Sequence, residues 1–311
     1  MKKLTAIILV FIMLLSTTAF AADFTDMPND WSTSALEATV KNGLLTGSYG
    51  RINPSHNLTR AEMAAIMVRA TGATKSADIS TFTDVKKDEW YYDYMSKAVA
   101  MGAFAGDGGK LRPNSPITRQ EAFLVLSRVF GLMASLDAKP EVLDQFKDRD
   151  KIADWAEKGI LAMVARGYVA GDNGNIKPLV SISRAEFAVV MDRLVKYYID
   201  DFSDNIPEDG NMMIRIPAKS IADLKTDKMI ILGDGMGDAE IVLKNTTADK
   251  LVVRGAKKVT LSSGTYNEVS VVSAGITLDG ASSKIQKAYV CKDSKFILPT
   301  MIDGESEDAS N

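Results

Sequence analysis

Three arginines stand in the same short motif at widely separated points of the chain. Each follows a Thr or Ser and lies two residues before a Glu; they are Arg60, Arg119 and Arg184. A guanidinium group binds a carboxylate through two parallel N–H donors. The motif stands where a helix is expected to begin, and there a cation opposes the helix dipole at a cost of about 0.3–1 kcal/mol. The repeated arginine therefore indicates a need for positive charge, met either by an anionic ligand or by an ion pair within the fold.

The other residues of the motif predict a helix start. A hydroxyl residue followed three positions later by Glu is the capping-box pattern, in which each side chain bonds the other residue's backbone N–H. The three pairs are Thr59 with Glu62, Thr118 with Glu121, and Ser183 with Glu186. Free N–H groups at a helix N-terminus attract anions, which favours a ligand near each arginine.

The motif is one part of a longer unit that occurs three times. Each unit opens with Phe-x-Asp and then has a Trp, a Gly sixteen residues later and the motif arginine thirteen residues after that. The aspartates are Asp26, Asp84 and Asp148, the tryptophans are Trp31, Trp90 and Trp155, and the glycines are Gly47, Gly106 and Gly171. The aspartates are the nearest candidates for ion pairs with the arginines.

Two helices are expected in each unit. The first begins near the Trp and ends at Gly43, Gly102 or Gly167, since helix C-termini favour residues that tolerate positive φ. The second begins at the motif and is apolar on several faces, which is typical of a core helix. We therefore expect the three second helices to meet in a central three-helix bundle.

Beyond residue 211 the apolar pattern changes to alternation. Pairs such as Ile230/Leu232, Ile241/Leu243 and Leu251/Val253 recur between turns rich in Gly, Asn, Asp and Ser. This pattern predicts short strands and favours a small parallel β-solenoid, with an antiparallel sandwich as the alternative. The run from Gly233 to Asp238 lacks the acid spacing of an EF-hand and the Lys of a phosphate-binding loop, so it predicts a turn.

Composition narrows the classes of function. His56 is the only histidine and Cys291 the only cysteine, which argues against histidine-dependent catalysis, multi-histidine metal sites and an intramolecular disulfide. We expect no metal and no cofactor. The formal net charge is −3, and −5 without residues 1–21, which argues against nucleic-acid binding.

The N-terminus has the pattern of a secretory signal peptide: Lys2 and Lys3, an apolar run from Leu4 to Leu15, and Ala19-Phe20-Ala21. We expect residues 1–21 to be removed, with no membrane-spanning segment left in the mature chain. The expected domains are repeats at 22–73, 82–132 and 146–199, an acidic linker at 200–211, a β-rich domain at 212–302 and a disordered tail at 303–311.

The repeated unit resembles the S-layer homology (SLH) family. The resemblance rests on Phe-x-Asp, Trp, the Gly-containing connector and motifs such as Leu58-Thr59-Arg60-Ala61-Glu62, and it covers residues 24–199. It implies an α-helical pseudo-trimer whose inter-repeat grooves bind a peptidoglycan-linked secondary cell-wall polymer, often one that carries a pyruvyl carboxylate. The motif arginines would then hold the carboxylate, the tryptophans face a sugar, the aspartates accept sugar hydroxyls, and the glycines allow close backbone approach. Core packing for the tryptophans and turn geometry for the glycines are the alternatives.

The predicted architecture is thus a multidomain α+β protein, with a three-repeat SLH pseudo-trimer followed by a small all-β domain. We expect a secreted, non-enzymatic protein of the cell wall or S-layer that anchors itself to the wall glycan. A wall-anchored carbohydrate-active enzyme with a catalytic β-domain, and an S-layer subunit that self-associates through that domain, are the alternatives.

Overall fold

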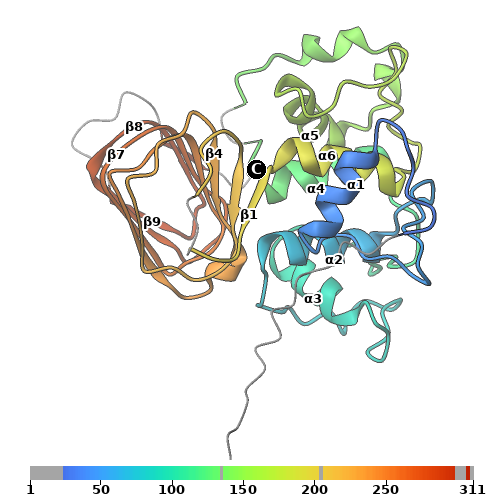
Figure 1. The fold of residues 1–311 in the computed structure, drawn as a ribbon, viewed down its shortest axis with the longest axis horizontal. Helices are drawn as coiled ribbons and strands as arrows, with labels where there is room; N and C mark the ends of the chain where they lie inside the picture. Colours follow the sequence, from blue (N-terminus) through green and yellow to red (C-terminus); the bar gives the residue numbers. More distant parts are fainter. Residues whose placement is uncertain (1–23, 134–135, 203–205, 298–305, 309–311) are drawn as a thin grey trace, which may run out of the picture.

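The computed structural model describes residues 24–133, 136–202, 206–297 and 306–308. Figure 1 shows the helices gathered on one side and the strands on the other. The expected signal peptide, residues 1–21, lies outside the described residues. None of the helices in the described part is long and apolar enough to cross a membrane.

Each repeat contributes two α-helices, as predicted. The pairs are α1 (Thr33–Lys41) with α2 (Arg60–Thr71), α3 (Tyr92–Ala100) with α4 (Arg119–Val129), and α5 (Asp154–Ala165) with α6 (Arg184–Leu194). Two short 3₁₀ helices, η1 (Pro140–Gln145) and η2 (Arg149–Lys151), lie before α5. Gly43, Gly102 and Gly167 follow the first helices with φ of 69°, 74° and 73°, so the glycine stop signals were correctly interpreted.

Helix pairing runs between repeats and closes into a ring. The closest helix pairs are α2 with α3, α4 with α5, and α6 with α1. Thus the second helix of each repeat packs against the first helix of the next, and the third repeat returns to the first. The second helices are buried along most of their length, and their apolar residues belong to one core.

A triangle of backbone hydrogen bonds joins the residues just before the three second helices. The N–H of Leu58 donates to the carbonyl of Ile182 (2.9 Å), that of Ile117 to Leu58 (2.9 Å), and that of Ile182 to Ile117 (3.1 Å). Because all three bonds run in the same sense, the repeats form a closed pseudo-threefold arrangement rather than a row.

The C-terminal part is a parallel β-solenoid, as predicted. Its strands are β1 (Tyr197–Ile199), β2 (Met212–Ile214), β3 (Ser220–Ala222), β4 (Met229–Leu232), β5 (Glu240–Lys244), β6 (Thr247–Val253), β7 (Lys258–Val271), β8 (Thr277–Val290), β9 (Lys295–Ile297) and β10 (Ser306–Asp308), with η3 (Asp234–Met236) between β4 and β5. One ladder runs β1, β2, β4, β6 and continues into the second halves of β7 and β8. The other runs β3, β5 and continues through the first halves of β7 and β8 to β9. Ile230, Leu251 and Val269 lie side by side in the interior, which explains the alternation seen in the sequence.

Two expected boundaries differ from the structure. The sheet begins at Tyr197, where β1 pairs with β2, and not at residue 212. The predicted linker at 200–211 therefore connects two paired strands of the solenoid. At the other end, Ser306–Asp308 pairs with β8, beyond the expected boundary at residue 302. The expected disorder of the tail stays a prediction, and residues 298–305 and 309–311 lie outside the described part.

Candidate functional site

The motif arginines form ion pairs between repeats. Arg60 bonds Glu121 (2.8 Å), Arg119 bonds Glu186 (2.9 Å) and Arg184 bonds Glu62 (3.0 Å), each through Nη1. Each partner is the capping-box Glu of the next repeat, so the pairs make a closed ring. The alternative of an ion pair within the fold is therefore correct, but its predicted partner, an aspartate, was wrong. In each Glu, one carboxylate oxygen accepts hydrogen bonds from its own helix cap and the other accepts one from the neighbouring arginine.

Each arginine also donates to the backbone of the following repeat. The Nε groups of Arg60, Arg119 and Arg184 bond the carbonyls of Leu111, Ile176 and Ile52 at 2.8–2.9 Å. In Arg184 the Nη2 group bonds the Thr46 carbonyl at 2.7 Å. Burial lowers the pKa of the three guanidinium groups and the neighbouring Glu raises it; guanidinium remains charged in proteins.

The expectation of free N–H groups at the helix N-termini was wrong. In α2, the N–H of Arg60 donates to the Ser115 carbonyl and that of Ala61 to the Pro113 carbonyl, while the N–H of Glu62 donates to Thr59. The equivalent groups of α4 and α6 are occupied in the same way. Carbonyls in the turn of the next repeat accept these hydrogen bonds, so the first N–H groups of the three helices are not available to an anion.

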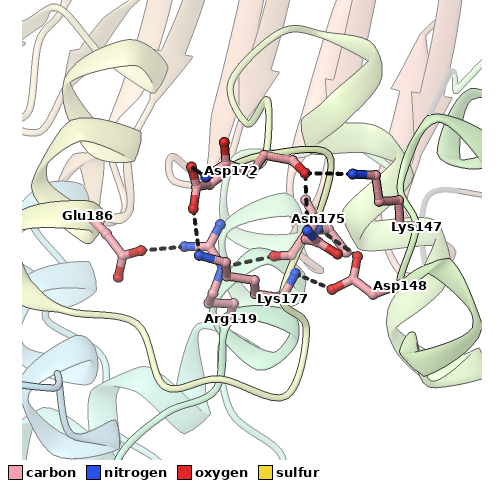
Figure 2. Close-up of polar contacts among 9 residues, drawn as sticks. Arg119, Lys147, Asp148, Asp172, Asn175, Lys177 and Glu186 are labelled. Atoms are coloured by element: carbon pink, nitrogen blue, oxygen red, sulfur yellow. Dashed lines mark hydrogen bonds and ion pairs between the residues drawn. The ribbon is translucent and has the colours of Figure 1, made fainter.

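The aspartates clamp the turns that receive these arginines. Figure 2 shows the third repeat, where Asp148 lies against the turn that leads to Lys177. Its two carboxylate oxygens accept the N–H groups of Ile176 and Lys177, both at 2.8 Å. Asp26 and Asp84 bind Ile52/Asn53 and Leu111/Arg112 in the same way. The second residue of each pair has a left-handed backbone, with φ of 51°, 53° and 54° at Asn53, Arg112 and Lys177. The clamp thus compensates for the strain of positive φ at residues other than glycine.

The glycines make room for the phenylalanine that opens each repeat. A Cβ atom on Gly47 would lie 2.1 Å from Cε1 of Phe24; the corresponding distances are 2.4 Å from Gly106 to Phe82 and 2.7 Å from Gly171 to Phe146. Gly106 and Gly171 also have φ of 73°. Packing and turn geometry together explain the repeated glycine, while close approach to a ligand stays a prediction.

The tryptophans are exposed. Trp31, Trp90 and Trp155 have 65%, 55% and 54% of their surface accessible, which excludes core packing as their role. Such exposure of an indole ring is unusual, because large aromatic side chains are highly buried on average. All three are therefore available to contact a ligand.

One groove collects predicted residues from all three repeats. It has a volume of about 220 Å³, and Arg184, Gly47 and Trp90 line it together with Glu62. Arg184 comes from the third repeat, Gly47 from the first and Trp90 from the second. We call it the Arg184 groove. The ring arrangement places Arg60, Gly106 and Trp155, and likewise Arg119, Gly171 and Trp31, in equivalent positions along the chain.

Two further groove residues escaped the sequence analysis. Arg69 lines the Arg184 groove and stacks on Tyr94, with its Cζ 5.1 Å from the ring centroid. It stands nine residues after Arg60, and Arg128 and Arg193 stand nine residues after the other motif arginines, so the repeat spacing could have revealed it. His56 also lines the groove, and neither Ser115 nor Val180, its counterparts in the other repeats, has an ionisable side chain.

Within the described residues, no group of three or more His, Cys, Asp or Glu side chains is placed to hold a metal ion. Among the same residues, the side-chain hydrogen bonds of Arg60 and Arg119 run from Nε and Nη1, and none runs from Nη2. The Arg184 groove thus places two arginines, Arg184 and Arg69, beside the exposed ring of Trp90.

Comparison with known proteins agrees with the repeat analysis. The S-layer homology domain family matches residues 23–64, 81–123 and 145–188. The chain is 33% identical over 172 residues to the Surface-layer 125 kDa protein of Lysinibacillus sphaericus. This alignment covers 53% of the chain and 14% of that protein. It is 30% identical over 150 residues to the Cellulosome-anchoring protein of Acetivibrio thermocellus, covering 46% of the chain and 33% of that protein.

It is also 28% identical over 170 residues to Exoglucanase XynX of A. thermocellus, covering 54% of the chain and 16% of that enzyme. The chain thus spans a third or less of these relatives. An undecaheme cytochrome from the S-layer of Carboxydothermus ferrireducens aligns with a TM-score of 0.28 and 16% identity over 55% of the chain and 22% of that cytochrome, too distant to support an argument. The three helical repeats of this chain are S-layer homology domains.

Proposed function

We propose that the protein anchors itself to the cell wall without covalent bonds, by binding an anionic, pyruvylated secondary wall polysaccharide in its inter-repeat grooves. The S-layer homology domains make the chain a secreted, cell-surface protein associated with the cell wall. The observation that carries the finer proposal is the Arg184 groove, where an exposed Trp90 faces the same hollow as Arg184 and Arg69.

In this proposal each groove residue has a separate task. In the Arg184 groove, Nε, Nη1 and Nη2 of Arg184 each donate one hydrogen bond to the protein, so the carboxylate of the ligand accepts the second N–H of Nη1 and of Nη2. Trp90 offers its half-exposed ring to the apolar face of a sugar. Glu62 orients Arg184 through their 3.0 Å ion pair and thereby fixes the direction of the remaining donors.

Three equivalent sets of groove residues on one closed ring, of which the Arg184 groove is one, favour a polymeric ligand. Once one repeating unit of the polymer is bound, the next groove meets a second unit at high effective concentration, which raises affinity without new contacts. The closed ring of hydrogen bonds and ion pairs keeps the grooves at fixed distances, as this mechanism requires.

A direct test uses walls from which the ketal-linked pyruvate has been removed by mild acid. The full-length protein should bind untreated walls and lose most of its binding to depyruvylated walls. Control walls that are taken through the same steps without acid, and so keep their pyruvate, should bind the protein as untreated walls do. Equal binding to untreated and depyruvylated walls would show that the arginines do not bind the pyruvyl carboxylate.

We further propose that the protein catalyses no reaction. The feature that most favours the enzymatic alternative is a solenoid groove of about 590 Å³ lined by Glu208, Asp209, Asp227 and Asp249. A general acid needs a raised pKa, yet a hydrogen bond from Lys228 holds the pKa of Asp227 below its ordinary value. Release of reducing ends from wall glycans during incubation with the protein would overturn this proposal.

A further inference from the structure

The solenoid contacts each repeat through a polar side chain that bonds two groups of that repeat at or near its helix ends. Arg215, just after β2, donates to the carbonyl of Asn42 at the end of α1 (3.1 Å) and to that of Arg69 in α2 (3.0 Å). Arg254, just after β6, donates to Met101 at the end of α3 and to Val129 in α4, both at 2.9 Å. Both arginines thus cap two helices at once.

The third repeat is held by an amide in the same manner. Nδ2 of Asn211, just before β2, donates to the carbonyl of Leu194 at the end of α6 and to the hydroxyl of Tyr168, which follows α5, both at 3.0 Å. Lys250 of β6 adds a bond of 2.7 Å to the carbonyl of Gly131 beyond α4. The last carbonyls of a helix have no partner in the helix itself, and cations near them also interact favourably with the helix dipole.

These contacts lie in a buried interface. Arg254 and Lys250 are 4% and 5% exposed, and each has an acid of the solenoid beside it: Asp234 at 2.8 Å and Glu268 at 2.6 Å. Around them, Met213, Ile231 and Val252 of the solenoid belong to the same apolar core as the helices. Figure 1 shows the strands of this ladder next to the helical part. The solenoid is therefore not a separate domain joined by a flexible linker, because it shares a core with the repeats.

The second helices are consequently fixed at both ends. The arginine–glutamate ring holds their N-termini, and the solenoid holds their C-termini. The groove wall lies between these two points: α2 contributes Glu62, near its start, and Arg69, near its end, to the Arg184 groove. The carbonyl of Arg69 is the one that Arg215 binds, so the solenoid touches the residue that supplies the second groove cation.

We infer that Arg215, Arg254 and Asn211 are positioning residues for the wall-binding grooves, one for each repeat. The solenoid acts as a base that sets the tilt of α2, α4 and α6 and hence the spacing of the three grooves. This inference rests on the proposed function, because its consequence is the simultaneous binding of several units of one glycan chain. Loosening a single contact should leave each groove intact but disturb the match between grooves.

The test uses the full-length protein with Arg254→Lys and Asn211→Ala, mild changes that keep the interface charge. Lys257→Met serves as the control, since Lys257 is an exposed solenoid cation that pairs at 3.6 Å with Glu240 of the solenoid itself. Amide hydrogen exchange is measured in the last turns of α4 and α6. Binding is measured to walls that carry the secondary polymer and to a single repeating unit released from that polymer.

We expect exchange in the affected helix end to rise about tenfold and wall binding to weaken about tenfold, with the affinity for the single unit changed less than about twofold. Lys257→Met should match the unmodified protein in all three measurements. Exchange and wall binding equal to those of the control would overturn the inference, as would faster exchange with unchanged wall binding. Failure of the unmodified protein to bind walls would refute the proposed function instead, and the exchange data would then still report whether the solenoid fixes the helix ends.

Discussion

Replacement of Arg184 by Ala should lower the stability of the protein as well as its binding to walls. Arg184 forms three hydrogen bonds, to the carbonyls of Ile52 (2.8 Å) and Thr46 (2.7 Å) and to the carboxylate of Glu62 (3.0 Å). Hydrogen bonds to a charged group contribute about 1.5–3 kcal/mol each when well buried. Because the side chain of Glu62 is 31% exposed and keeps its cap contacts, we take about 1 kcal/mol for each bond, or about 3 kcal/mol in total.

The assay is thermal and urea unfolding followed by circular dichroism. With about 2–4 °C per kcal/mol for a chain of this size, Arg184→Ala should lower Tm by roughly 6–12 °C. The matched control is Arg51→Ala, since the side chain of Arg51 is 62% exposed and pairs with Asp26 at 3.5 Å; it should cost less than about 1 kcal/mol. If Arg184→Ala were no more destabilising than Arg51→Ala, the ion-pair ring would not be a structural element.

Three further predictions concern the residues around the ring. Gly47→Ala should destabilise the protein by about 2 kcal/mol or more in the same urea titration, because the new methyl group overlaps Phe24. The control is Gly43→Ala, which should cost about 1 kcal/mol, because Gly43 has no atom near its Cβ position and only a left-handed φ of 69°. Equal losses for the two variants would contradict the packing argument. Burial raises the pKa of Asp26, but hydrogen bonds from two backbone N–H groups and from the neighbouring Arg51 outweigh it and hold the pKa below 3.8. Its contribution to stability should thus be present above about pH 4 and lost below it, so Asp26→Asn should flatten the acid side of a plot of unfolding free energy against pH; an unchanged slope would refute this. Trp90→Ala should weaken wall binding about fivefold, the equivalent of about 1 kcal/mol of ring contact, and shift Tm by no more than about 2 °C; a large loss of stability would mean that the ring supports the fold.

Much of the architecture followed from local patterns. The capping boxes, the glycine stops and the alternation in the C-terminal part each report a backbone conformation that neighbouring residues determine. For this reason the six α-helices of the described part and the solenoid interior could be predicted without knowledge of the tertiary fold. The start of the solenoid escaped prediction because Tyr197–Ile199 is only three residues long, too short to display alternation.

The relations between repeats could not be predicted in this way. Nothing local in the sequence says that Arg60 meets Glu121 rather than an acid of its own repeat, because that choice depends on the ring order. The same holds for the Arg184 groove, whose Arg, Gly and Trp come from three different repeats. Arg215 and Arg254 looked like ordinary charged residues beside strands, and only their distances to the helix ends give them a role.

The central claim is that the grooves bind a polymer attached to the wall. The most direct measurement is sedimentation of the full-length protein with purified walls, before and after chemical removal of the secondary polymer, alongside a variant in which Trp31, Trp90 and Trp155 are all replaced by Ala. We expect binding to complete walls, loss of binding after removal, and weak binding by the variant despite an unchanged Tm. Equal sedimentation with complete and stripped walls would contradict the account.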